Sequence, residues 1–228
     1  MRGPPGDATH TGVDVNVVTL TLGRVAEAGD NPRLQVWLTT DPAGQDRWAL
    51  PGAALTPTVD LEGATRAVLA DIGVNDPRHL EQLASFGAPE RTPGRHSVSV
   101  TYLALIPQPH EGHGGQWAPL EQGSVPVAMA WDHGLIVDTA VQRVRSKLSY
   151  SNIAFGLLPD EFTMSELQAV YEAVWDTTLD KRNFRRKVGT LGLLAPTGGQ
   201  RRGSHRPARL YTFVSSELVL LDDVIATS

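Results

Sequence analysis

The chain has 228 residues, of which 41% are hydrophobic and 20% are charged, as in an ordinary globular protein that buries one or two cores. It has no cysteine, which excludes disulfide bonds and thiolate metal sites and agrees with a cytoplasmic location. No apolar run approaches the roughly 20 residues that cross a bilayer, so we expect no membrane partner.

The net charge of −5 is divided unevenly along the chain. Residues 1–142 carry 8 Lys and Arg against 16 Asp and Glu, whereas residues 143–228 carry 12 against 9. Nine basic residues and no acidic one lie between Lys181 and Arg209. Such a block is typical either of a solvated surface or of a surface that contacts phosphates.

The first part of the chain has the pattern of a mixed α/β domain. Residues 1–12 are rich in Gly and Pro and are expected to form a disordered tail. Apolar residues at helical spacing predict a helix at Leu61–Ile72 that ends at Gly73. We assign the domain to residues 13–131. Strands are predicted at Val13–Leu22, Leu34–Thr40 and Val98–Ile106.

After Trp131 the hydrophobic period becomes helical, and a helix at 132–149 is expected to connect two domains. Thr163 and Glu166 form a Thr-x-x-Glu capping box that opens the next helix, and a further helix begins at Asp180. Helix, turn, helix and hairpin in this order are typical of a winged helix-turn-helix, which we assign to residues 150–228. The hairpin strands are predicted at Leu191–Ala195 and Arg209–Val214.

Residues 52–74 resemble the Nudix box, which reads Gly, five residues, Glu, seven residues, then Arg-Glu-hydrophobic-x-Glu-Glu-x-Gly-hydrophobic. Its register is filled without a gap by Gly52, Arg66, Val68, Gly73 and Val74. Its glutamates are replaced by Thr58, Ala67, Ala70 and Asp71. Nudix hydrolysis uses divalent cations held by several carboxylates on one helix face, and one Asp cannot hold a pair of them. The resemblance therefore implies a Nudix-like fold without catalytic residues or a metal site.

Two further segments resemble one narrower family, the Nudix-related transcriptional regulators of the NrtR type. Residues 80–105 (LEQLASFGAPERTPGRHSVSVTYLAL) resemble a stretch of these regulators and of Nudix proteins that handle ADP-ribose. The chain from Asp132-His133 to Arg206-Pro207-Ala208-Arg209-Leu210-Tyr211 resembles their winged-helix domain. The resemblance implies an α+β protein, with a Nudix-like α/β/α sandwich followed by a winged helix-turn-helix.

The family resemblance also implies a function. It implies a homodimer that represses genes of NAD synthesis or salvage from a palindromic operator in double-stranded DNA. ADP-ribose or a related NAD-derived nucleotide would be the effector that releases the DNA, with no cofactor required. The resemblance implies that the loop with Arg91 and Arg95 faces the ligand. Planar guanidinium groups suit bidentate contacts with a pyrophosphate. The candidate ligand-binding residues are Trp48, Gly52, Arg66, Arg91, Arg95 and His96.

The second helix of the C-terminal domain divides into two faces. Phe184 and Val188 can pack inward, which leaves basic and amide side chains to contact DNA bases and phosphates. The candidate DNA-binding residues are Lys181, Arg182, Asn183, Arg185, Arg186, Arg201, Arg202, His205 and Arg206.

We expect a regulator and not an enzyme. Asp71 leaves open an ADP-ribose pyrophosphatase with an appended DNA-binding domain, and a constitutive repressor with an inactive pocket is a third interpretation.

Overall fold

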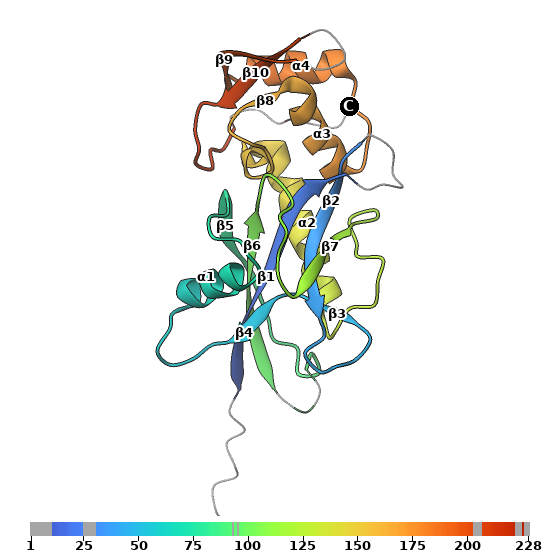
Figure 1. The fold of residues 1–228 in the computed structure, drawn as a ribbon, viewed down its shortest axis with the longest axis vertical. Coiled ribbons are helices and arrows are strands. Elements are labelled where there is room, and N and C mark those ends of the chain that lie inside the picture. Colours follow the sequence, from blue (N-terminus) through green and yellow to red (C-terminus); the bar gives the residue numbers. More distant parts are fainter. Residues whose placement is uncertain are drawn as a thin grey trace, which may run out of the picture.

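The computed structural model describes residues 11–24, 31–92, 94, 96–202, 207–221 and 225. In this part of the chain, seven strands form a mixed sheet in the order β3-β2-β1-β6-β5, with β4 paired to β1 and β7 paired to β2 (Figure 1). The strands are Gly12–Gly23 (β1), Arg33–Thr40 (β2), Trp48–Ala49 (β3), Gly52–Ala54 (β4), His79–Phe86 (β5), Ser97–Leu105 (β6) and Gly115–Pro119 (β7).

The central strand β1 explains why the sheet is covered on both sides. It pairs with β6 in parallel and with β2 and β4 in antiparallel orientation. Successive side chains of a strand point to opposite faces. Val15 and Val17 join the apolar cluster on one face, and Val18 and Leu20 join the cluster on the other. Each face therefore requires a helix to cover it.

Helix α1 (Leu61–Asp71) covers the face of Val15 and Val17. Asp60 caps its N-terminus, where its Oδ1 accepts a hydrogen bond from the Gly63 amide at 2.7 Å. The helix ends before Gly73, whose φ of +87° is in the left-handed region that favours glycine. The predicted helix and its glycine stop are confirmed.

Helix α2 (His133–Tyr150) covers the other face and extends to the C-terminal part of the chain (Figure 1). Its buried stripe belongs to a single apolar cluster that includes Val18 and Leu20 of the sheet and also Leu167 and Tyr171 of the C-terminal part. The helix expected to connect two domains therefore packs against both, and the core is continuous across it. The buried stripe consists of Ile136, Val137, Ala140, Val141, Val144 and Leu148.

The C-terminal part lies beyond one end of the sheet, at the top of Figure 1. Among its described residues, three strands pair in the order β8-β10-β9, and α3 packs against α4 with the rings of Tyr171 and Phe184 5.1 Å apart. Across the described residues, no helix has the length and apolar character needed to cross a membrane. The elements are Ile153–Leu157 (η1), Phe162–Thr163 (β8), Met164–Trp175 (α3), Lys181–Thr190 (α4), Leu194–Arg201 (β9) and Ala208–Phe213 (β10).

One predicted strand has the wrong limits. The first hairpin strand was expected at Leu191–Ala195 with a loop after it, whereas β9 spans Leu194–Arg201. Leu191 is the C-cap of α4, and Gly192 turns the chain with a φ of +64°, so the strand cannot begin earlier. Pairing with β10 then extends β9 through a Gly-rich segment that has little β propensity of its own. In the expected tail, residues 1–10 lie outside the described residues and Gly12 already belongs to β1.

Candidate functional site

Helix α4 presents the predicted basic face to solvent. Phe184 and Val188 are buried against the rest of the C-terminal part. Asp180 caps the helix, with its Oδ1 accepting from the Asn183 amide at 2.8 Å. At 3.6 residues per turn, Arg182 and Arg186 lie directly opposite the buried pair and form the centre of the exposed face. The exposed residues of α4 include Lys181, Arg182, Asn183, Arg185 and Arg186. Of these, Lys181 lies in the first turn, on the side of Phe184.

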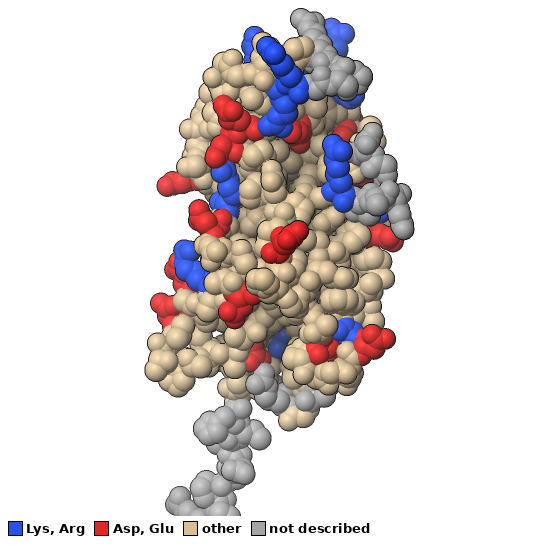
Figure 2. Space-filling model, viewed as in Figure 1, with Lys and Arg blue, Asp and Glu red and all other residues tan. Residues whose placement is uncertain are grey.

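Figure 2 shows Lys and Arg side chains gathered at the end of the molecule that carries α4 and the hairpin. The predicted wing residues divide into three cases. Arg202 is exposed, and His205 and Arg206 lie outside the described residues. Arg201 pairs with the Glu166 carboxylate and donates to the Glu161 carbonyl at 3.1 Å. Its guanidinium therefore ties β9 to the start of α3.

A groove of about 760 Å³ separates α4 from the hairpin. Arg185 of α4 and Arg209 of β10 both line it, so it is a cationic groove beside the exposed face of α4. Arg209 was not among the predicted site residues. It could have been found from the alternation along β10, because Leu210 is buried and Arg209 points the other way.

The predicted capping box at the start of α3 is present. Thr163 Oγ1 accepts from the Glu166 amide at 3.2 Å, and the Glu166 carboxylate accepts from the Thr163 amide at 2.7 Å. We expect Thr163→Ala to lower the free energy of unfolding by about 1 kcal/mol, the usual cost of losing such a cap. Urea denaturation would measure it, with Ser165→Ala at an exposed position of the same turn as the control. Equal values for the two variants would contradict the role of the box.

The helix that corresponds to the Nudix box does not offer a metal site. Among the described residues, no group of three or more His, Asp or Glu side chains is placed to hold a metal ion. Asp71 is exposed at the end of α1, and Arg66 pairs with Glu62 one turn away at 2.9 Å. Alanines at positions 67 and 70 leave this helix face without the oxygen ligands that Mg²⁺ requires.

Trp48 and Gly52 lie on the two short strands β3 and β4. A side chain at Gly52 would come within 2.2 Å of Asn16 Nδ2 and 2.7 Å of the Val15 carbonyl, so only glycine lets β4 pair with β1 here. The backbone of Trp48 donates to Ala128 at 2.9 Å and accepts from Ala130 at 2.7 Å. This segment therefore contacts the residues immediately before α2.

The arginine-bearing loop contains the other candidate ligand-binding residues. Arg91 is buried, and its Nε and Nη2 donate to the two carboxylate oxygens of Asp132 at 2.9 Å each. His96 is exposed, with its Nδ1 2.9 Å from Thr11 Oγ1. Arg95 lies outside the described residues. Sequence reasoning did not identify Asp132, because it is distant from the loop in the chain.

Polar side chains are buried on the α2 side of the sheet, beside Arg91. Ser99 Oγ donates to Asn16 Oδ1 at 2.7 Å and lies 3.1 Å from Thr101 Oγ1, and Arg91 Nη1 donates to Ser97 Oγ at 3.2 Å. We call Asn16, Ser97, Ser99 and Thr101 the buried polar row. The same face becomes apolar further along, at Leu103 and Leu105. The polar half is therefore the half at which α2 begins.

His133, the first residue of α2, is also held by the sheet domain. Its Nδ1 accepts from the Leu50 amide at 2.9 Å, and its ring packs edge to face on Trp131. Burial lowers the pKa of His133 to about 4; Arg91 acts in the same direction, and Asp132 and Asp41 oppose it. The ring is therefore neutral at pH 7, which leaves Nδ1 free to accept.

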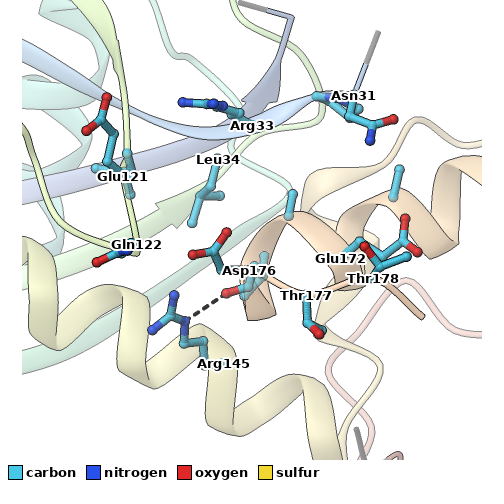
Figure 3. A pocket seen from close by; sticks show the side chains of 16 residues that line it. Asn31, Arg33, Leu34, Glu121, Gln122, Arg145, Glu172, Asp176, Thr177 and Thr178 are labelled. Carbon is cyan, nitrogen blue, oxygen red and sulfur yellow. Dashed lines mark hydrogen bonds between the residues drawn. The ribbon is translucent and has the colours of Figure 1, made fainter. Parts of the chain in front are cut away.

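The far half of α2 is attached to both parts of the molecule. Glu81 of β5 pairs with Arg143 and Lys147 of the helix. On the other side, Arg145 Nε donates to the Val174 carbonyl at 2.7 Å, and Trp175 Nε1 donates to the Arg145 carbonyl at 3.1 Å. Figure 3 shows Arg145 at the edge of a cleft of about 700 Å³, lined by the sheet domain and by the end of α3. Helix α2 thus links the two parts at this junction.

Comparison with known proteins agrees with this architecture. Residues 154–213 match the family model of the NrtR DNA-binding winged helix domain. The ADPR-responsive transcriptional repressor NtrR of Acinetobacter baylyi is 35% identical over 209 residues, which cover 85% of this chain and 81% of that protein. The chain belongs to the NrtR family. The predicted family membership is therefore confirmed.

Solved structures extend the likeness to both parts of the chain. NrtR of Shewanella oneidensis in complex with a 27mer DNA is 28% identical, with a TM-score of 0.77 over 94% of this chain and 99% of that one. A MutT/nudix family protein of Enterococcus faecalis is 20% identical, with a TM-score of 0.68 over 93% of this chain and 89% of that one. The predicted fold, a Nudix-like sandwich followed by a winged helix, is confirmed.

Proposed function

We propose that the chain is a transcriptional repressor that binds a DNA operator through α4 and the hairpin and is released by ADP-ribose. The observation that carries the proposal is the exposed basic face of α4, centred on Arg182 and Arg186, on a helix pair fixed to a Nudix-like domain. That domain keeps the Nudix fold but has no carboxylate cluster for metal catalysis among its described residues. A ligand-binding domain that does not hydrolyse its ligand, joined to a DNA-binding surface, is the arrangement expected of a ligand sensor.

The effector is ADP-ribose or another NAD-derived nucleotide. The protein acts in the cytoplasm and controls genes of NAD synthesis or salvage. Two copies bind a palindromic operator, because a two-fold dimer doubles the contacts on a two-fold site. Residues 13–131 bind the effector, 132–149 link, and 150–228 bind DNA. The ligand contacts come from the segment of Trp48 and Gly52, from Arg66, and from the Arg91–His96 loop.

The test is the affinity for DNA with and without ADP-ribose. Duplexes of about 30 base pairs, long enough for two half-sites one helical turn apart, are selected by the protein from a random pool. We expect saturating ADP-ribose to weaken binding of the selected duplex about 10-fold or more, within the usual range of allosteric coupling. Fluorescence anisotropy would measure it, with adenosine monophosphate as the control nucleotide.

Two outcomes would contradict the proposal in different ways. An unchanged DNA affinity at ADP-ribose concentrations that calorimetry shows to be saturating would contradict effector release. An unchanged affinity with no calorimetric binding would identify a constitutive repressor.

The exposed carboxylate of Asp71 is the observation that favours an ADP-ribose pyrophosphatase instead. Release of adenosine monophosphate from ADP-ribose in the presence of Mg²⁺, at many turnovers per chain, would establish that alternative.

A further inference from the structure

Arg91 has an unusual position for a basic residue. It is the one Lys or Arg in the described part of the chain that is buried, with 3% of its side chain exposed. Both carboxylate oxygens of Asp132 accept from it at 2.9 Å, and Ser97 accepts from its third nitrogen at 3.2 Å. A buried guanidinium needs such partners, because an unpaired buried charge is strongly unfavourable. Asp132 is the counter-ion that satisfies it.

The surroundings of Arg91 are those of a site for a polar anion. The buried polar row leads to it along the sheet and supplies hydroxyl and amide groups that can hydrogen-bond the oxygens of an anion. Guanidinium groups bind carboxylates and phosphates with the same two-pronged geometry. The Asp132 carboxylate, whose side chain is 17% exposed, therefore occupies the place that two phosphate oxygens would take.

We infer that Asp132 is an internal competitor of the effector. Without ligand its carboxylate occupies Arg91, and the diphosphate of the effector displaces it when it binds. This inference rests on the proposed function and names the contact through which the effector regulates DNA binding. The diphosphate is the part of the ligand that acts, because it is the group that matches the guanidinium in charge and geometry.

Displacement of Asp132 reaches the DNA-binding surface through α2. Asp132 is the N-cap of this helix, which is followed at once by the His133 contact with Leu50. The 18 residues of α2 form a rod about 27 Å long at 1.5 Å per residue. Its far half contacts Val174 and Trp175 at the end of α3. A shift at the first turn therefore moves the helix pair that carries α4.

The thermodynamic consequence distinguishes a competitor from an ordinary structural ion pair. The state with the Arg91–Asp132 pair binds DNA, and the state without it binds the effector. Any change that weakens the pair moves the population toward the second state. The effector then binds more tightly and DNA binds less tightly. Loss of a merely structural contact would weaken both.

The experiment is Asp132→Asn, which removes the charge and keeps the shape. We expect the variant to bind ADP-ribose about 10-fold more tightly in calorimetry and the selected DNA duplex about 10-fold more weakly in anisotropy. Asp138→Asn is the matched control, because Asp138 lies on the same helix and accepts from Ser124, away from Arg91. It should leave both affinities unchanged. A loss of both affinities in Asp132→Asn, or wild-type values for both, would overturn the inference.

A measurement on the wild-type protein covers the case in which Asp132→Asn does not fold. Hydrogen exchange of the α2 amides from Ile136 to Ala140 should become faster when ADP-ribose is added, since the Ile136 amide donates to the Asp132 carbonyl. Unchanged exchange at saturation would overturn the inference even if ADP-ribose releases DNA. If ADP-ribose does not affect DNA binding in the wild type, the proposed function fails instead. The two failures are thereby separated.

Discussion

Replacing Arg186 with alanine is expected to weaken the binding of α4 to each half-site of the selected DNA duplex by about 30-fold. Arg186 lies directly opposite the buried Phe184 and Val188, where an α4 inserted in the major groove would approach the bases most closely. A bidentate arginine contact with a guanine contributes about 1–3 kcal/mol, and about 2 kcal/mol corresponds to about 30-fold. In a dimer the substitution affects both half-sites. Anisotropy titrations at fixed salt would measure the loss.

The control for Arg186→Ala is Arg33→Ala, which removes the same charge from an exposed position of β2. We expect it to change DNA affinity only slightly, because charges beyond the Debye length of about 8 Å are screened at physiological ionic strength. The unfolding midpoint of Arg186→Ala should equal that of the wild type, since the side chain is exposed. Equal DNA affinities for the two variants would show that the recognition surface lies elsewhere.

The sequence predicts best the elements whose determinants are local. The capping box at Thr163, the cap at Asp180 and the glycine stop at Gly73 lie where the residue types indicate, because each involves contacts within four residues along the chain. The first hairpin strand was placed too early, since the limits of β9 depend on pairing with β10 and on the turn at Gly192. The short strands β3 and β4 have too few residues for a periodic pattern, and tertiary pairing alone defines them.

The candidate effector site shows a different limit of sequence reasoning. The loop arginines were identified from the resemblance, but the partner of Arg91 is 41 residues away in sequence and is brought to it only by the packing of α2 on the sheet. The buried polar row could not be recognised either. Its Ser and Thr residues alternate with Val and Tyr along β6, which reads as an ordinary half-buried strand until the position of α2 is known. Local sequence thus indicates the donor groups and tertiary structure determines what they bind.

The free energy of unfolding is expected to fall as the pH is lowered from about 6.5 to about 4, because His133 must stay neutral in the folded chain. Burial lowers its pKa to about 4 in the folded chain, against about 6.5 when it is unfolded. Between these values the unfolded state binds more protons, so acidification favours unfolding. At about 1.4 kcal/mol per pH unit, the full loss is about 3 kcal/mol. Urea denaturation at constant ionic strength from pH 7 to pH 4.5 would measure most of it.

His133→Asn isolates this contribution, because an amide oxygen can still accept from the Leu50 amide and cannot titrate. We expect a lower stability at pH 7, from the lost ring packing on Trp131, and a much flatter dependence on pH. Exposed His113 provides the control, since His113→Asn should keep the wild-type slope.

Glu81 does not obscure the window in which His133 titrates. Burial alone would raise the pKa of Glu81, but contacts with His79 and Lys147 lower it to about 2, so its contribution is lost only below about pH 4.5. A wild-type slope in His133→Asn would assign the acid sensitivity to another group. If the stability of His133→Asn does not depend on pH in this window, the proton acts at His133, where α2 meets Leu50. Acid would then loosen the same end of the helix that the Arg91–Asp132 pair holds.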